Sequence, residues 1–200
     1  QARNITTDTN GDIYITGRAR SENGLADQPY AGGKFDAFVA RLNPDGTRQW
    51  LRMFGDSEWE EARGIATDGD QGLYVTGRTS GAFGQQTYQG GMFDAFIAHY
   101  ERNGARNWVQ FLGTTGHDEG RRVASNAAGE AYLAGIVGGD LPEVTYSGGA
   151  FDGLLARYDS AGNRLSLQIA GTPGDDRFMG IDVDDSGVAY LAGRSNGGLG

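Results

Sequence analysis

The sequence contains no cysteine, so neither disulfide bonds nor thiolate chemistry can contribute to this protein. It also lacks a run of apolar residues long enough to span a bilayer, and no signal peptide is visible. We therefore expect no membrane insertion. Because cysteine is absent, the cellular compartment cannot be inferred from disulfide usage.

Basic residues are in short supply, with 17 Lys and Arg against 26 Asp and Glu and a net charge of −9. A duplex nucleic-acid ligand needs a basic surface, so we expect no nucleic-acid partner. The sequence also lacks a phosphate-binding glycine loop before a helix, a Cys/His cluster and a haem motif. These absences predict that the protein carries no cofactor.

Glycine, in contrast, is abundant at 35 of 200 residues, and much of it belongs to a repeat. A Gly-Gly-x-Phe-Asp motif occurs three times at intervals of 58 residues. Its copies cover residues 32–36, 90–94 and 148–152. A fixed period of this size is typical of repeat architectures.

Each repeat predicts four short antiparallel strands joined by turns rich in Asp, Asn and Gly. In the first repeat they cover 5–7, 13–17, 37–42 and 49–54, and about nine residues link the last strand to the next repeat. The fourth copy contains only the first two strands. The predicted fold is an all-β propeller of four-stranded antiparallel blades, about 3.5 in this chain. The expected blades cover approximately 1–60, 61–118 and 119–176, with a half blade at 177–200.

The combined pattern resembles the bacterial SBBP β-propeller repeat family. It reads Ile-x-x-Asp, Tyr-Val-Thr-Gly, Gly-Gly-x-x-Asp-Ala-Phe-Val-Ala, Asp-x-x-Gly, Trp and Gly, and it covers essentially the whole chain. The third repeat departs most, with Ser166 in place of Trp50 and Trp108, and Gly153 in place of an alanine. The resemblance implies a bacterial protein that is secreted or displayed at the cell surface.

Propellers close with four to eight blades, so this segment is too short to form a ring. We expect further blades from the same longer chain, within a larger ring for which seven blades is one option. Completion of the ring by a second copy is the less favoured alternative.

Residues that recur in every repeat are expected to build the blade. Asp36, Asp94 and Asp152 should cap backbone N–H groups, since short acidic side chains commonly do so in turns. Trp50 and Trp108 occupy equivalent positions and are expected in the core.

Ligand sites are expected on the face that carries the connections from the second to the third strand and from the fourth strand to the next repeat. We call this the loop face. Its predicted ligand residues are Trp59, Glu60, His117, Asp118, Asp176, Arg18, Arg78 and Arg194. The recurring acids among them could bond loop amides, or could form an arc of carboxylates near the axis that binds a cation. Calcium is possible, although the turn at 8–12 fits an EF-hand loop poorly.

Three functions remain open. The favoured one is a non-enzymatic interaction module that binds a protein or a glycan, in which case substitution of Trp59 or His117 should weaken binding without changing thermal unfolding. The second is a propeller glycoside hydrolase or lyase, although no spacing singles out a pair of catalytic carboxylates. The third is a pure scaffold or spacer in a larger surface assembly.

Overall fold

The computed structural model describes residues 1–20, 28–69 and 72–198. Within these ranges the regular secondary structure consists of β-strands alone. No helix in this part of the chain is long and apolar enough to cross a membrane. Residues 21–27, which belong to the connection from the second to the third strand of the first repeat, lie outside the described residues.

In the described part of the chain, fourteen strands form three four-stranded sheets and one two-stranded sheet, all antiparallel. The first sheet contains β1 (Ala2–Thr7), β2 (Ile13–Ala19), β3 (Asp36–Leu42) and β4 (Arg48–Phe54). The second contains β5 (Glu60–Thr67), β6 (Gly72–Thr79), β7 (Asp94–Glu101) and β8 (Arg106–Leu112). The third contains β9 (Glu119–Ser125), β10 (Ala131–Val137), β11 (Asp152–Tyr158) and β12 (Arg164–Ala170). The last contains β13 (Asp176–Val183) and β14 (Ala189–Ser195).

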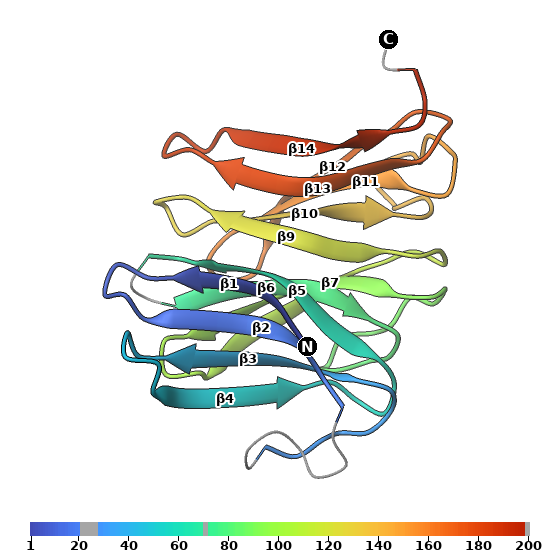
Figure 1. Cartoon of the computed structure of the whole chain (residues 1–200). Coiled ribbons are helices and arrows are strands. Elements are labelled where there is room, and N and C mark those ends of the chain that lie inside the picture. Colours follow the sequence, from blue (N-terminus) through green and yellow to red (C-terminus); the bar gives the residue numbers. More distant parts are fainter. Residues whose placement is uncertain (21–27, 70–71, 199–200) are drawn as a thin grey trace.

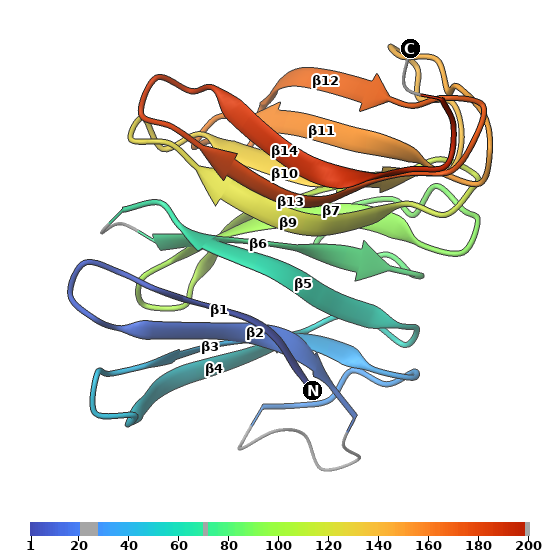
Figure 2. The same cartoon turned by 45° about the horizontal axis from the view of Figure 1, so that its top comes forward.

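Each sheet is a meander whose strands lie side by side in chain order. The sheets stack face to face along the chain, as Figures 1 and 2 show from two directions. The first strands of successive sheets contact one another, β1 with β5, β5 with β9 and β9 with β13. They therefore form the inner wall of the array. The sequence prediction of an all-β protein made of propeller blades is confirmed.

The sheets are joined by hydrophobic clusters and by tryptophans that reach into the next blade. Trp50 is buried, and its Nε1–H donates to the carbonyl of Arg102 in the following sheet at 2.9 Å. The Nε1–H of Trp108 donates in the same way to the carbonyl of Ser160 at 2.9 Å. The expectation that these residues serve packing agrees with this geometry. Ser166, the substitute in the third repeat, is exposed on β12.

The inner strands begin earlier than the sequence analysis predicted. In the second repeat, β5 begins at Glu60, so five residues rather than the expected nine or so separate it from β4. Glu60 and Asp176 consequently lie within strands rather than in linkers, and Asp118 directly precedes β9. A β-bulge interrupts each inner strand. The extra residue breaks the alternation of side chains between the two faces of the strand, so the sequence pattern did not show that the strands extend back to Glu60 and Asp176.

Candidate functional site: the loop face and the axial wall

Backbone hydrogen bonds bind the two kinds of loop together at the loop face. The N–H of Glu60 donates to the carbonyl of Phe35 at 2.8 Å, and that of Asp118 to the carbonyl of Phe93 at 2.8 Å. Asp176 donates to Phe151 at 2.7 Å. The two connections thus share one face, as the sequence analysis predicted, and each Gly-Gly-x-Phe-Asp motif is fastened to the start of the next blade.

The second glycine of this motif is required for the junction. Gly33 has a φ of 67° and Gly91 a φ of 72°, in the left-handed region that side chains disfavour. A Cβ on Gly33 would also collide with the carbonyl of Glu58, and one on Gly91 with that of Gly116. The motif therefore recurs because two loops must approach at backbone distance.

The recurring carboxyl groups are buried and bonded to loop amides. Asp36 accepts from the N–H of Ala31 at 2.6 Å, and Asp94 accepts from the N–H of Gln89 at 2.6 Å. Both carboxyl groups are fully buried. The first-repeat and second-repeat aspartates thus cap loop N–H groups, as predicted. Asp152 does the same with the N–H of Ser147.

The acids at the start of the next blade have the same role. Glu60 accepts from the N–H of Asp56 at 2.9 Å and from the Thr79 hydroxyl at 2.9 Å. Asp118 accepts from the N–H groups of Thr114 and Gly138, at 2.6 and 2.9 Å. In the fourth copy, Asp176 accepts from the N–H of Thr172 at 2.6 Å. Of the two interpretations that the sequence left open, these contacts favour the scaffold.

Burial governs the protonation of these carboxyl groups. It raises the pKa of Asp36 to about 6, that of Asp94 to about 7 and that of Glu60 to about 8, against the opposing effect of their N–H donors. Burial also raises the pKa of Asp118. In the two-stranded last sheet, a hydrogen bond from Ser195 lowers the pKa of Asp176. Burial therefore shifts the carboxyl groups of these loop junctions in the complete sheets toward the neutral form.

Trp59 and His117 belong to a ladder of rings that runs from blade to blade. Centroid distances are 5.6 Å from Phe35 to Trp59, 5.2 Å from Trp59 to Phe93, 5.4 Å from Phe93 to His117 and 5.3 Å from His117 to Phe151. We call this the aromatic ladder. It joins Phe35 to Trp59 and Phe93 to His117 of the next connection, so both predicted ligand residues pack between blades.

Arginines cover this ladder on its axial side. The guanidinium of Arg18 lies 4.2 Å from the ring centroid of Phe35, and that of Arg78 lies 4.1 Å from that of Phe93. Lys34 lies 4.5 Å from the Trp59 ring. Cations at such distances interact favourably with the negative ring face. The Trp59 ring is therefore packed against other side chains rather than left open as a platform for a sugar.

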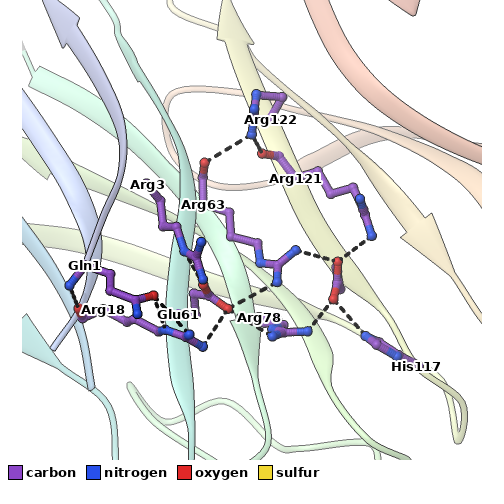
Figure 3. Close-up of polar contacts among 10 residues, drawn as sticks. Gln1, Arg3, Arg18, Glu61, Arg63, Arg78, His117, Arg121 and Arg122 are labelled. Carbon is purple, nitrogen blue, oxygen red and sulfur yellow. Dashed lines mark hydrogen bonds and ion pairs between the residues drawn. The ribbon is translucent and has the colours of Figure 1, made fainter. Parts of the chain in front are cut away.

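Two buried glutamates hold the arginines in place (Figure 3). Glu61 forms ion pairs with four of them: Arg3 at 2.5 Å, Arg18 at 3.5 Å, Arg63 at 3.2 Å and Arg78 at 3.0 Å. Its side chain is fully buried. Although burial opposes ionisation, these cations lower the pKa of Glu61. It therefore stays ionised.

Glu119 is the corresponding anion of the next blade. It pairs with Arg63 at 2.9 Å and Arg121 at 2.9 Å, and also contacts Arg78. His117 Nε2 lies 2.9 Å from its Oε1. Burial opposes ionisation, but the His117 hydrogen bond and the arginines bring the pKa of Glu119 to about 2. The inner wall thus contains ionised carboxylates surrounded by guanidinium groups.

The structure brings together only part of the predicted ligand set. Trp59, His117, Arg18 and Arg78 meet at the aromatic ladder and the inner wall. The three recurring acids lie apart in their own loop junctions. Arg194 is exposed on β14, away from this group.

Sequence reasoning missed the inner-wall residues. Arg3, Arg63 and Arg121 occupy equivalent positions in three repeats, and Met179 is their counterpart in the fourth. A basic residue that recurs within an acidic chain was the available signal. The exposed third positions of the Gly-Gly-x-Phe-Asp motif were also missed; they differ in each copy and are Lys34, Met92 and Ala150.

No cluster of three or more His, Asp or Glu suited to a metal ion occurs among residues 1–20, 28–69 and 72–198. The acids of the turn at 8–12 have protein partners: Asp8 accepts from the N–H of Asn10 at 3.0 Å, and Asp12 pairs with Arg41 and Arg102, each at 2.6 Å. Cation binding at this turn would have to displace these contacts.

Stacked four-stranded meanders with their first strands on an inner wall define a β-propeller repeat array. The family model described as SBBP, beta-propeller repeat, matches residues 1–24, which contain β1 and β2. This match supports the predicted family over residues 1–24, which are similar to the SBBP β-propeller repeats. A search of curated proteins finds no match to the chain.

Proposed function

We propose that this propeller segment is a non-enzymatic interaction module of a secreted or cell-surface bacterial protein. Its loop face would bind a partner protein or a glycan. The observation that supports this best is the contrast between invariant and variable positions on that face. The motif's Gly, Phe and Asp are used in junctions between blades, whereas Lys34, Met92 and Ala150 are exposed and differ from copy to copy.

Met92 is the most informative of these positions. Its side chain is 60% exposed, although the residues on either side of it hold the blade junction. A thioether exposed at Met92 and an ammonium group exposed at Lys34, the equivalent position of the previous repeat, suit a partner with mixed apolar and acidic character. We assign no catalytic residue in this proposal.

The test is binding to two panels, one of purified acidic and neutral polysaccharides and one of purified acidic and basic proteins, measured by biolayer interferometry. The double variant Lys34→Ser/Met92→Ser should lose about tenfold or more in affinity with only a small change in thermal unfolding, since the contact of Lys34 with the Trp59 ring lies at the surface. Leu165→Ser, which alters an exposed residue on β12, is the matched control and should bind normally.

Two outcomes would contradict the proposal. Absence of any binder in both panels would favour the scaffold or spacer alternative. Release of reducing ends from a polysaccharide, measured in the same panel, would favour a propeller glycoside hydrolase or lyase.

A further inference from the structure

Each inner strand carries one residue more than its neighbour, and these extra residues share a position. In the pairing of β1 with β2, Ala2 lies opposite Gly17 and Asn4 opposite Thr16, so Arg3 has no counterpart. The same irregularity leaves Arg63 unmatched in β5, Arg121 in β9 and Met179 in β13, as the registers show. A β-bulge re-aims the side chain of its extra residue, and bulges are common beside binding sites.

The bulge residues line a cavity of about 260 Å³ together with one neighbour, Arg122. The cavity wall therefore contains four guanidinium groups and one thioether: Arg3, Arg63, Arg121, Arg122 and Met179. We call it the axial cavity. Such a concentration of positive charge is unexpected in a chain with a net charge of −9.

The charges around the cavity are only partly compensated. Only two carboxylates, those of Glu61 and Glu119, form ion pairs with five arginines: Arg3, Arg18, Arg63, Arg78 and Arg121. Arg122 is a sixth cation, and its described contacts include no carboxylate. Instead, Nη1 of Arg122 donates to the carbonyls of Arg63 at 3.3 Å and Arg121 at 2.8 Å. These are the carbonyls of the bulge residues, so the bulges themselves hold Arg122 at the cavity.

The hydrogen-bonding capacity of the wall is also incompletely used. Nη1 of Arg121 faces the sulfur of Met179 at 3.1 Å, and a thioether is a weak acceptor. The Nε–H groups of Arg63 and Arg121 are buried without an acceptor in the described part of the chain. Guanidinium donors that lack an oxygen partner favour the arrival of an oxyanion.

We propose that the axial cavity is a binding site for a compact oxyanion, such as phosphate, sulfate or the carboxylate of an acidic group. The planar fork of arginine donates two parallel N–H groups, which match these ligands. The anion is either a free ion or an acidic substituent of the partner. The second case rests on the proposed function, whereas the first is independent of it.

The test is isothermal titration with sodium phosphate at pH 7, against sodium chloride of matched ionic strength. The wild-type protein should give saturable heat with phosphate and none with chloride. Arg122→Gln should weaken phosphate binding by about tenfold, since it removes a charged donor without stranding a buried carboxylate. Arg164→Gln is the control: it removes the same charge on β12, where the partner Glu143 is exposed, and should bind normally.

Met179→Glu is a second variant, which tests the site by adding a carboxylate rather than by removing a hydrogen-bond donor. Met179 is 46% exposed, so a carboxylate there is sterically tolerable and would face Arg121. This variant should raise the thermal midpoint and abolish phosphate binding because it supplies its own anion. Absence of saturable phosphate heat in the wild type, or wild-type affinity in both Arg122→Gln and Met179→Glu, would overturn the proposal.

A competition arm distinguishes the two sources of the anion. Where phosphate displaces a panel binder from the wild type and Met179→Glu no longer binds it, the partner supplies the acidic group. Where the binder is unaffected, the cavity binds a free ion. If phosphate fails to bind but the Lys34/Met92 variant still loses its partner, the axial site is wrong and the proposed function stands.

Discussion

Glu60 and Glu61 are neighbours on β5, and both are fully buried, yet their surroundings are opposite. Glu60 is bonded by a backbone N–H and a hydroxyl, and burial raises its pKa to about 8. Glu61 is paired with four arginines that lower its pKa. Because successive side chains of a strand point to opposite sides, one strand separates a neutral carboxyl group from an ionised one.

The same division recurs in the next blade, where Asp118 is in the loop junction and Glu119 among the arginines. The junction position is acidic in the second, third and fourth copies, as Glu60, Asp118 and Asp176, because it bonds loop amides. The next position, which holds Glu61 and Glu119 at the inner wall, varies: it is Gln1 in the first copy and Arg177 in the fourth. The comparison shows that each blade keeps a constant frame while the chemistry of its inner wall changes.

The largest effect should come from neutralising the two glutamates separately. Glu61→Gln leaves four arginines without their shared anion, and we expect a loss of about 3–5 kcal/mol in the free energy of unfolding. Glu60→Gln keeps the shape of a largely neutral group and removes the proton uptake that folding requires of Glu60 at pH 7, so we expect no loss of stability at that pH. Urea denaturation measures both. Equal losses would show that the two sides of β5 are electrostatically alike.

The aromatic ladder should give the next effect. Because Trp59 packs on Phe35 and Phe93, Trp59→Ala should cost about 2–4 kcal/mol, less than a fully buried tryptophan since the ring is half-buried. The sequence-based expectation of unchanged unfolding is therefore replaced by one of lost stability. Trp59→Phe should recover most of this loss in thermal unfolding. An unchanged thermal midpoint in Trp59→Ala would instead support a role for Trp59 in ligand binding.

The pH dependence of stability tests the contrast between the carboxyl groups of the loop junctions and those of the inner wall. The raised pKa values of Asp36, Asp94 and Glu60 contribute stability that is fully present below about pH 4, the unfolded range, and is lost as the pH rises through about 6 to 8. The lowered pKa of Glu119 contributes stability that is present above about pH 4.5 and is lost as the pH falls toward about 2. These groups together predict maximal stability near about pH 4 to 5.

Urea midpoints between pH 3 and 9 test this profile. In Glu60→Gln the slope above pH 5 should be shallower, by at most about 1.4 kcal/mol per pH unit for one proton, while the acid limb stays the same. An unchanged alkaline limb in this variant would mean that Glu60 is ionised in the folded protein.

The smallest effect is expected at Arg194. It occupies the repeat position of Arg78 but is exposed, so Arg194→Gln should change the free energy of unfolding by no more than about 0.5 kcal/mol. Arg78→Gln, which breaks contacts with Glu61 and Glu119, should cost several times more. Similar values in thermal melts would show that repeat position, rather than local contact, determines the role of these arginines.

The repeat made the fold predictable from the sequence. The blades and caps were predicted from the 58-residue period, the turn glycines and the recurring Asp36 position. A residue that recurs in each copy is one that the backbone conformation of every blade requires. The same logic explains why the recurring acids are structural.

The inner wall was not predictable in the same way. Arg3 and Glu61 belong to different blades, and only the stacking of sheets brings them together. The bulge at Arg63 adds one residue and breaks the alternation that would have extended β5 back to Glu60. Trp59 is unique to one repeat, which suggested a ligand residue, whereas its packing against Phe35 and Phe93 follows only from the stacking of blades.

A glycine on the second strand faces each bulge: Gly17, Gly77, Gly135 and Gly193 all pass so close to an inner-strand carbonyl that a Cβ would collide with it. This pairing of an inserted residue with a bare backbone confines the distortion to one spot. Evolution could therefore change the bulge side chain in one blade at a time. Such changes would alter the chemistry of the axial cavity without changing the fold of the blades.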